Sequence, residues 1–487
     1  MKILFAASEA VPFSKTGGLG DVCGALPKAL KKRGHDVRVI LPRAWNIDKA
    51  KAGLKPVLSP MGVSMGQGTV WCSVLEGKVG DVPFYFVEHE GYFGRAGLYD
   101  DGKREYADNA ERFGFFSRAC LQLCRDLPFQ PDILHAHDWP TALAPVYLKT
   151  LEFLDPFFRE TASVYSIHNL SYQGVFRPAS LPFLGLSGEF TESKLEAFGG
   201  LNFMKAAIFF SDMISTVSPA YAEEILSEPG GNGLSVYLQR RRGDLLGILN
   251  GADYEQWDPA KDRLIPARYS PRDMAGKAVC KRELQKEFLL ENAADVPVIG
   301  VVSRFVSQKG LQLLAPVIKD LVRNMRVQFV LLGSGEKGLE DFFGGLPAEF
   351  PGKVGAWIGY DEGKAHRIEA GADFFLMPSL YEPCGLNQIY SMKYGTLPIV
   401  RATGGLKDTV RSYREDLGTG TGFCFEAAHA GAIYNTVGWA VSTYYDRPRH
   451  VEAMRKEAMA QDFSWEKSAL RYEEIYEKAL ARRSLWT

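Results

Sequence analysis

The eight residues Lys15-Thr16-Gly17-Gly18-Leu19-Gly20-Asp21-Val22 decide the fold class of this chain. They follow the short apolar run 3–7, which is typical of a buried strand, and they precede residues 25–30, which predict a helix. A further apolar run at 37–41 predicts a second strand and completes a β-α-β unit. We therefore expect an α/β protein built on parallel strands.

The glycine-rich turn in this unit predicts a site for a phosphate group. Gly17, Gly18 and Gly20 allow the backbone to turn sharply and to come close to a ligand. The following helix directs free N–H groups and the positive end of its dipole into the turn. Lys15 adds a full positive charge there.

Dinucleotide binding is a weaker interpretation of the same turn. Gly24 stands one position late for the third glycine of a G-x-G-x-x-G motif. The acidic residue that would bind a ribose should end the second strand, whereas Asp36 lies at its start. We therefore place NAD binding below phosphate binding.

Length and composition indicate a multidomain globular protein without a nucleic-acid or membrane partner. A chain of 487 residues is too long for one hydrophobic core. Its net charge of −1, without a long basic run, argues against nucleic acid and anionic membranes. No window approaches the about 18 apolar residues of a membrane-spanning helix. Seven cysteines without paired CxxC spacing and the lack of a signal peptide predict a cytoplasmic location.

Strand and helix patterns alternate along the chain in two series. Residues 55–90 interrupt the first series with Val-, Tyr- and Phe-rich segments that predict an antiparallel insertion. Residues 252–275 are rich in Asp, Pro and Arg and predict a linker, after which a second series begins at 298. We predict two doubly wound, Rossmann-like domains that face each other across a cleft, and a helical C-terminal end: 1–250, 251–460 and 461–487.

The motif of the first turn recurs in the second series. Thr16-Gly17-Gly18-Leu19 returns as Thr403-Gly404-Gly405-Leu406, each time after a predicted strand. This equivalent placement predicts a second helix amino terminus that faces the cleft.

Two cations and a carboxylate lie where strands of the second series end. Arg304 and Lys309 follow one strand, and they suit a diphosphate because Arg offers a fork of donors and Lys a point charge. Glu382 comes just before a helix start, where the N–H groups of Gly385 and Leu386 can meet an anion.

These motifs together resemble those of bacterial glycogen synthases and plant starch synthases. The shared motifs are the turn 15–19, the Arg304/Lys309 pair and Glu382-Pro383-Cys384-Gly385-Leu386. The resemblance implies a retaining glycosyltransferase of the GT-B type with its active site in the interdomain cleft. The enzyme would transfer glucose from ADP-glucose to the non-reducing end of an α-1,4-glucan such as glycogen, release ADP and need no cofactor. The resemblance also implies that the C-terminal helix crosses back to the first domain.

In the second series, the resemblance assigns most contacts with the donor. Arg304 and Lys309 would clamp the diphosphate and stabilise the charge that grows on the leaving ADP. Glu382 would bind hydroxyls of the glucosyl ring. The remaining donor contacts that the resemblance implies are Cys384 beside Glu382, Gly385, Leu386, and Tyr360 stacked on adenine.

In the first series, the resemblance points to a histidine. His168 resembles a sugar-proximal histidine whose backbone carbonyl would stabilise an oxocarbenium-like centre, although a histidine that caps a strand end is the alternative. Four further residues match family positions near the donor: Lys15, Gly18, Asp138 and Asn250. Loop aromatic residues could stack on the glucan acceptor: Tyr99, Trp139 and Tyr172.

No metal site is predicted. His135 and His137 lie at a strand end, and we expect their side chains to point to opposite faces. The Asp-x-Asp motif of another large glycosyltransferase class is also not convincing. Arg304, Lys309 and helix ends would meet the diphosphate charge instead.

One position departs from the wider GT-B group, in which a second Glu often follows the first by eight residues. Tyr390 occupies that position here. The chain also lacks the paired carboxylates expected for double displacement. We therefore favour a front-face transfer in which the departing phosphate deprotonates the acceptor hydroxyl.

Two other classes of function compete with this interpretation. A sugar epimerase or dehydrogenase needs the NAD fingerprint, which fits poorly. A silent glucan-binding protein would be expected to have lost one of the charged site residues, and all are present: Lys15, Arg304, Lys309 and Glu382. UDP-glucose stays open as the donor because its phosphates offer the same contacts, and the oligomeric state is not predicted.

Overall fold

The computed structural model describes residues 1–484 and divides the chain into two compact units. The first comprises Met1–Gly251 and the C-terminal segment from Trp465, and the second comprises Ala252–Ser464. The chain therefore passes between the units twice. Of the predicted segment 461–487, residues 485–487 lie outside the described residues.

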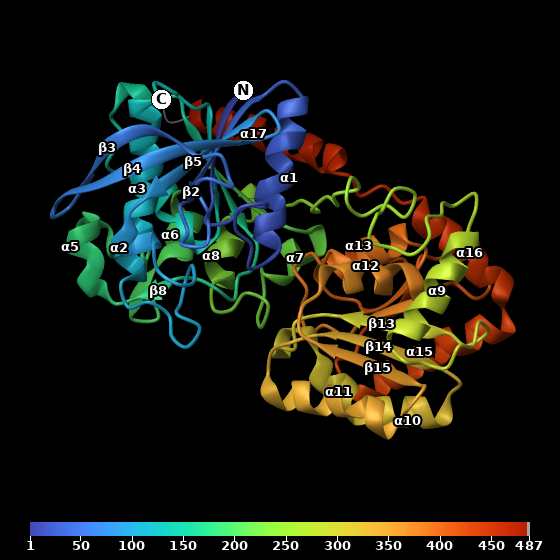
Figure 1. Ribbon diagram of the computed structural model, residues 1–487. Coiled ribbons are helices and arrows are strands. Elements are labelled where there is room, and N and C mark those ends of the chain that lie inside the picture. Colours follow the sequence, from blue (N-terminus) through green and yellow to red (C-terminus); the bar gives the residue numbers. More distant parts are fainter. Residues whose placement is uncertain (485–487) are drawn as a thin grey trace. The chain divides into compact units, whose positions relative to one another are not determined.

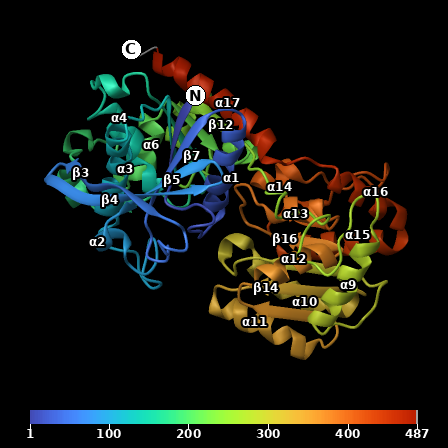
Figure 2. The same ribbon diagram turned by 45° about the horizontal axis from the view of Figure 1, so that its top comes forward.

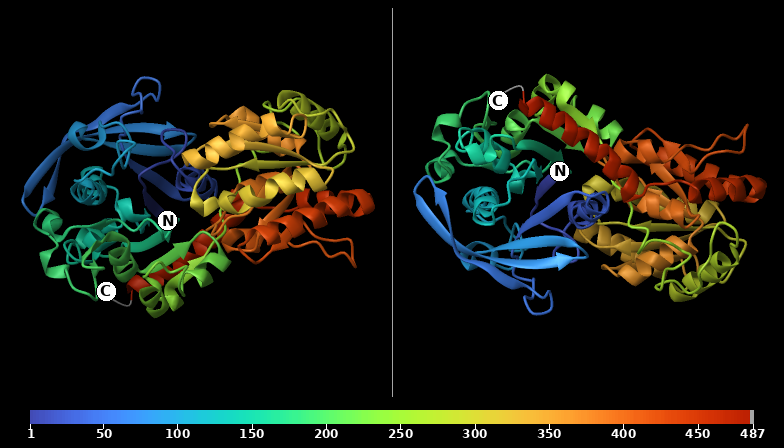
Figure 3. Two further views of the ribbon diagram at one scale, coloured as in Figure 1. Left: turned by 90° about the horizontal axis from the view of Figure 1, so that it is seen from below. Right: turned by 90° about the horizontal axis from the view of Figure 1, so that it is seen from above.

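The first unit is built on a nine-stranded mixed sheet (Figure 1). Residues 55–90 form the antiparallel strands β3 and β4 at one edge, followed by β5, which returns parallel to β2. Figure 3 shows the long blue strands curving around helix α3 (Asn109–Asp126). In spatial order the strands are β12 (Leu245–Gly247), β11 (Met213–Thr216), β7 (Ala162–Ile167), β6 (Ile133–His137), β1 (Lys2–Ala6), β2 (Asp36–Pro42), β5 (Val82–Glu88), β4 (Gly68–Val79) and β3 (Lys55–Met65).

Helices cover both faces of this sheet because alternate side chains of its buried strands point to opposite faces. Helices α1 (Gly18–Lys32) and α17 (Trp465–Ser484) share one core with the strands, and Figure 2 shows α17 running beside α1. Glu473 of α17 contacts Arg33 and His35, each at 2.7 Å, and so fixes the C-terminal helix to this unit. Helices α3, α4 (Leu143–Lys149) and α6 (Phe203–Phe210) pack on the other face.

Shorter elements complete the first unit. They are the helices α2 (Glu90–Phe93), α5 (Leu181–Leu184), α7 (Pro219–Glu224) and α8 (Ser235–Arg240), and the small sheet of β8 (Val175–Phe176), β10 (Gly200–Asn202) and β9 (Glu196–Ala197). Single turns of 3-10 helix occur at Trp139–Thr141, Pro156–Phe158, Pro178–Ser180, Ser187–Glu189 and Arg242–Asp244.

The second unit is built on six parallel strands. Their spatial order is β15 (Val354–Ile358), β14 (Gln328–Gly333), β13 (Val298–Val302), β16 (Phe374–Met377), β17 (Leu397–Arg401) and β18 (Phe423–Phe425). The chain starts at β13, builds outward through β14 and β15, and then returns to the other side of β13 with β16. The strand order therefore reverses between β13 and β16, and ligands bind at such a switch point in doubly wound sheets.

Two layers of helices sandwich this sheet, and Figure 1 shows α12 and the pair α10–α11 on opposite sides of β13, β14 and β15. One apolar core includes α9 (Ala275–Glu287), α12 (Glu362–Gly371) and α14 (Gly404–Thr409). The other includes α10 (Leu311–Asn324), α11 (Lys337–Glu349), α13 (Asn387–Lys393), α15 (Ala430–Asp446) and α16 (Pro448–Met459). A 3-10 turn at Ser307–Lys309 precedes α10.

The predicted linker 252–275 packs into the second unit. Trp257 is stacked between His366 and Tyr390, with ring centroids 3.6 and 4.2 Å away. Asp262 accepts hydrogen bonds from the Tyr394 hydroxyl at 2.6 Å and contacts His366 Nδ1 at 2.8 Å. Tyr390, at the position of the second family glutamate, is therefore a core residue in this chain.

Candidate active site

In the second unit, the predicted cations and carboxylate meet at the switch point of the sheet. Lys309 follows β13 and Glu382 follows β16, which are neighbouring strands. The Lys309 ammonium donates to Glu382 Oε2 at 2.6 Å, and the Ser379 hydroxyl donates to the same oxygen at 3.0 Å. The Glu382 side chain is only 6% exposed. Because the other carboxylate oxygen accepts no hydrogen bond within residues 1–484, it can serve a ligand.

Arg304 adds a second positive charge at the end of β13. Its side chain is exposed, and among residues 1–484 its guanidinium forms no ion pair. Lys309 still has two ammonium protons to donate, because Glu382 takes one. One carboxylate and two cations leave this edge with an excess positive charge, which suits a diphosphate.

The turn that contains Glu382 packs tightly against the second glycine motif, Thr403-Gly404-Gly405-Leu406. A Cβ at Gly404 would overlap the Glu382 carbonyl, and one at Gly405 would overlap the Cys384 carbonyl. Gly405 also donates its N–H to the Glu382 carbonyl at 3.0 Å. The repeated Thr-Gly-Gly-Leu motif therefore has different surroundings in the two units. In the second unit it packs backbone on backbone at Gly404 and Gly405, and the orientation of its helix toward the cleft stays a prediction.

The residues after Glu382 expose backbone donors. Gly385 adopts the left-handed conformation with φ of +72°, and within residues 1–484 the N–H groups of Gly385 and Leu386 donate no hydrogen bond. Cys384 is buried, as expected for a thiol that fills a tight turn. These N–H groups lie next to the Glu382 carboxylate in the chain and can bind polar atoms of a ligand.

Tyr360 lies at the end of β15, on the same edge of the sheet. Its side chain is 76% exposed, so a ring face is accessible for stacking. Trp357 lies three residues earlier and contacts the Lys364 ammonium over its ring, at 4.5 Å from the centroid. The edge from β15 to β16 thus presents an aromatic ring, the cations and Glu382 in that spatial order.

In the first unit, the glycine-rich turn already holds an anion of the protein itself. Glu9 accepts hydrogen bonds from the backbone N–H groups of Thr16 and Gly17, and from the Thr16 hydroxyl at 2.7 Å. These N–H groups were predicted to be free for a phosphate, and Glu9 was not among the predicted site residues. In the sequence, Glu9 is recognisable only as a carboxylate three residues after the first strand. No motif distinguishes it from an ordinary surface residue.

Gly18 and Lys15 still border open space around this turn. Apart from its chain neighbours and the backbone of its own helix, no heavy atom of residues 1–484 lies within 4 Å of the position that a Cβ of Gly18 would take. The Lys15 ammonium forms an ion pair with Asp21 at 2.7 Å, and half of the Lys15 side chain is exposed. A ligand can therefore approach Gly18, while Asp21 orients Lys15.

Asp138 and His168 lie together at the ends of β6 and β7. Asp138 Oδ1 accepts a hydrogen bond from the His168 N–H at 2.7 Å. Asp138 has a φ of +52° without being a glycine, a strained conformation that clusters at functional sites. Loss of solvation raises the pKa of Asp138 to about 7 and lowers the pKa of His168 to about 3. His168 is therefore neutral at physiological pH.

The other two histidines of this region correct a prediction. His135 and His137 are two residues apart in a strand, so their side chains point to the same face, and their ring centroids are 4.0 Å apart. Burial lowers the pKa of both well below the usual value. Within residues 1–484, no group of three or more His, Cys, Asp or Glu residues could hold a metal ion.

Asn250 presents an unpartnered polar atom at the end of the first unit's sheet. The residue is 4% exposed, and its Oδ1 accepts no hydrogen bond within residues 1–484. Buried polar atoms without partners are uncommon, and a ligand is one explanation. Asn250 follows β12, so it belongs to the same strand-end edge as Asp138 and His168.

The three candidate acceptor aromatics have different surroundings. Tyr99 donates its hydroxyl to Glu9 at 3.1 Å and shares an aromatic cluster with Trp139, with centroids 5.8 Å apart. Trp139 also packs on Phe113 and against Gly174. Tyr172 is 55% exposed. Of the three, Tyr172 presents the most open ring.

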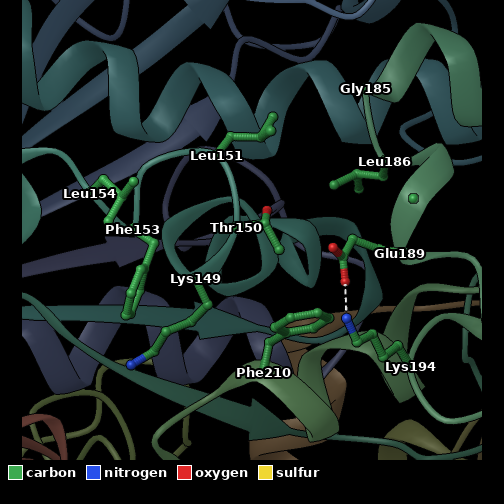
Figure 4. Close-up of a pocket in the computed structure, with 11 residues that line it drawn as sticks. Lys149, Thr150, Leu151, Phe153, Leu154, Gly185, Leu186, Glu189, Lys194 and Phe210 are labelled. Carbon is green, nitrogen blue, oxygen red and sulfur yellow. Dashed lines mark hydrogen bonds and ion pairs between the residues drawn. The ribbon is translucent and has the colours of Figure 1, made fainter. Parts of the chain in front are cut away.

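A surface pocket of about 470 Å³ lies elsewhere in the first unit (Figure 4). It adjoins Lys149 and Phe210, which end α4 and α6 at the edge of the sheet where β7 and β11 begin. Figure 4 shows the Glu189–Lys194 ion pair on one side of this pocket, and the two atoms are 2.5 Å apart. None of the predicted site residues lines the pocket.

Titration of Asp138 makes the stability of the protein depend on pH. In the folded protein the Asp138 carboxyl keeps its proton up to about pH 7. In an unfolded chain an Asp carboxyl has a pKa of about 3.9. The stabilisation is full at low pH and is lost as the pH rises through 7. We expect the free energy of unfolding of the wild type, relative to Asp138→Asn, to fall by roughly 2 kcal/mol between pH 5 and pH 8.

Urea unfolding at several pH values measures this difference. Asp81→Asn, on an exposed turn of the same unit, is the matched control. A difference between wild type and Asp138→Asn that stays constant or grows with pH would contradict the assigned titration.

Comparison with known proteins identifies the family. The model of the starch synthase catalytic domain matches residues 2–240, and that of glycosyl transferases group 1 matches residues 283–458. Glycogen synthase 1 of Geobacter metallireducens is 48% identical over 99% of this chain and 97% of its own length. The chain belongs to the glycogen synthase family. The glycogen synthase of Anaeromyxobacter dehalogenans strain 2CP-C is also 48% identical, over 98% of this chain and 99% of its own.

A solved structure of this family supports the fold. The catalytic domain of starch synthase IV from Arabidopsis thaliana, bound to ADP and acarbose, matches with a TM-score of 0.90 and 32% identity over 99% of both chains. The predicted family, GT-B fold class and glucosyltransferase activity are thereby confirmed. Among the helices described within residues 1–484, none is long and apolar enough to cross a membrane.

Proposed function

We propose that the protein transfers glucose from ADP-glucose to the non-reducing end of an α-1,4-glucan, with retention of configuration and release of ADP. The observation that carries this proposal is the Lys309–Glu382 pair at the switch point of the second unit's sheet. There, cations for a diphosphate stand beside a carboxylate with one open oxygen for sugar hydroxyls. Membership in the glycogen synthase family supports the glucan as acceptor.

In this proposal the residues of the second unit hold the donor. Arg304 and Lys309 bind the diphosphate and stabilise its growing negative charge as ADP leaves. Glu382 accepts hydrogen bonds from the glucosyl ring, and the free N–H groups of Gly385 and Leu386 bind oxygen atoms of the donor. Tyr360 stacks on the base.

The residues of the first unit act at the sugar. Within residues 1–484 the His168 carbonyl accepts no hydrogen bond, so its partial negative charge is available to an oxocarbenium-like centre. Asn250 Oδ1 and the open face of Gly18 supply further contacts. Tyr172 is the acceptor aromatic with the most exposed ring.

The transfer follows a front-face course. The bond from the anomeric carbon to the donor phosphate oxygen breaks, and a bond to the acceptor 4-hydroxyl oxygen forms on the same face. The departing phosphate takes the proton of that hydroxyl. Tyr390 supports this course because it packs on Trp257 and offers no second carboxylate. Trapping of a covalent glucosyl-enzyme would contradict it.

The cytoplasm is the proposed location. All seven cysteines are free thiols, which suits a reducing compartment.

The decisive experiment measures nucleoside diphosphate release from ADP-glucose and from UDP-glucose, each with and without glycogen. We expect release from ADP-glucose that depends on glycogen, with glucose entering an amylase-sensitive chain. Release from UDP-glucose alone would change the donor and keep the rest of the proposal. Absence of release from both donors would overturn it.

Tyr360→Ala is expected to raise KM for ADP-glucose by about tenfold, since base–aromatic stacking stabilises a complex by about 1–3 kcal/mol. The kcat should change little because the reacting bond is remote from the base. Tyr360→Phe keeps the ring and should keep KM. Initial rates over a range of ADP-glucose concentrations measure both constants.

Tyr445→Ala, at another partly exposed tyrosine of the second unit, is the control for a general surface effect. An unchanged KM in Tyr360→Ala would remove this residue from the donor site.

A further inference from the structure

His137 is a fully buried polar residue to which neither the sequence motifs nor the family match assigns a role. It ends β6, and its exposed fraction is 0%. Its ring is stacked on Phe5 with centroids 5.2 Å apart, and it lies 4.0 Å from the ring of His135. His135 is itself held by the Tyr476 hydroxyl of α17 at 2.9 Å and the Ser166 hydroxyl at 2.7 Å. The His137 ring is therefore immobilised by packing on two sides.

One atom of His137 reaches the candidate active site. Its Nδ1 lies 3.0 Å from Nε2 of His168, within hydrogen-bond distance. The His168 backbone N–H is held by Asp138 at 2.7 Å. His168 is thus fixed at its main chain and at one ring nitrogen. Its other ring nitrogen, Nδ1, forms no hydrogen bond within residues 1–484 and is not enclosed.

The surroundings of His137 Nε2 indicate which ring nitrogens of His137 and His168 carry protons. Its Nε2 is buried and has no hydrogen-bond partner within residues 1–484. A buried N–H without an acceptor is rarer in proteins than an unsatisfied acceptor. His137 is therefore expected to leave Nε2 unprotonated and to donate from Nδ1. His168 must then accept at Nε2 and hold its own proton on Nδ1.

We propose that His137 is a positioning residue that holds the His168 ring and fixes its tautomer, so that His168 Nδ1–H is a hydrogen-bond donor toward the bound sugar nucleotide. The proposal rests on the proposed function for the identity of that ligand. The buried ring cluster of Phe5, His137 and His135 holds the His137 ring in place, and the Nδ1–Nε2 hydrogen bond fixes the His168 ring to it. A donor at this place suits a hydroxyl or phosphate oxygen.

Two substitutions of His137 separate positioning from packing. In His137→Asn, the side-chain amide can place a polar atom close to the position of Nδ1, whereas His137→Leu keeps bulk and removes the hydrogen bond. We expect His137→Leu to lower kcat by about 10- to 100-fold with a small change in KM for ADP-glucose. His137→Asn should recover most of this loss, although thermal unfolding should show both variants to be destabilised.

The tautomer of His168 is measured directly by two-bond ¹H–¹⁵N correlation spectra of protein labelled at histidine. Loss of a signal in His168→Asn assigns the resonance. We expect the Nδ1–H form in the wild type and in His137→Asn, and a mixture of tautomers in His137→Leu. His366→Asn, at a buried histidine of the second unit, is the matched control and should leave the His168 signal unchanged.

The outcomes are distinguishable from a failure of the proposed function. The spectra need no substrate, so they test the tautomer even if ADP-glucose is not the donor. An Nε2–H tautomer in the wild type, or an unchanged His168 signal in His137→Leu, would overturn the proposal. Equal kcat in the Leu and Asn variants at equal stability would also overturn it.

Discussion

Lys309→Met is expected to lower kcat/KM for ADP-glucose by about 10²- to 10³-fold, the loss typical when one donor to a developing anion is removed. The ammonium contacts Glu382 at 2.6 Å and keeps two protons for the diphosphate of the donor. Because charge on the diphosphate grows as the glycosidic bond breaks, the loss should appear mainly in kcat. Steady-state rates with ADP-glucose and glycogen measure it.

The same substitution also destabilises the protein, and the two effects must be separated. Without Lys309, the nearly buried Glu382 carboxylate loses its countercharge, and an uncompensated buried charge is costly. The double variant Lys309→Met/Glu382→Gln removes both charges. It should regain thermal stability relative to Lys309→Met while its activity stays low. Activity in the double variant equal to that of Glu382→Gln alone would show that Lys309 acts only through its pairing with Glu382.

Lys319→Met, in helix α10 just after the turn that contains Lys309, is the matched control. Lys319 pairs with Glu349 at 2.5 Å, and both side chains are more than a third exposed. An exposed ion pair contributes about 0–1 kcal/mol, so stability and rate should stay close to those of the wild type. A loss in Lys319→Met as large as that in Lys309→Met would contradict a specific role for Lys309.

Glu382→Gln is expected to lower kcat by about 10²-fold or more while ADP still binds. The amide keeps the size of the side chain but loses the charge that accepts from Lys309 and from sugar hydroxyls. Ser379 can still donate to the amide oxygen, so the turn should keep its shape. Gly404 and Gly405 support that turn through backbone contacts that do not involve the side chain.

Two measurements identify the step at which Glu382→Gln fails. Titration with ADP should give a Kd within a few-fold of the wild type, whereas turnover of ADP-glucose should be strongly reduced. Glu349→Gln removes the carboxylate of the exposed pair and should leave both quantities unchanged. Near-normal turnover in Glu382→Gln would exclude Glu382 from contact with the reacting sugar.

Much of the fold was predictable because local patterns determine it. Buried apolar runs separated by helical periodicity predict strands of a parallel sheet, and the carboxyl ends of such strands share one edge. Arg304 lies shortly after β13, and Glu382 lies in the loop that follows β16, so their common edge could be inferred without coordinates. Residues 55–90 depart from that pattern in composition, and their antiparallel pairing was predictable for the same reason.

The contacts within the site depended on segments far apart in the chain. Lys309 and Glu382 are 73 residues apart, and only the order of β13 beside β16 brings them together. The hydrogen bonds from the first glycine turn to Glu9 span only seven residues, but they too could not be predicted because no motif specifies this path of the chain. The pairing of His137 with His168 likewise required β6 and β7 to be neighbours.

The sequence by itself determined the strand-end residues, the α/β class and the family, since these depend on residue types at short spacings. The tertiary structure alone decided which backbone N–H groups already donate a hydrogen bond within the protein and which can bind a ligand. Two equal glycine motifs illustrate this: one faces open space at Gly18, and the other packs on the Glu382 turn at Gly404. The difference arises because a glycine's surroundings are set by segments that pack on it, and local sequence contains no record of those segments.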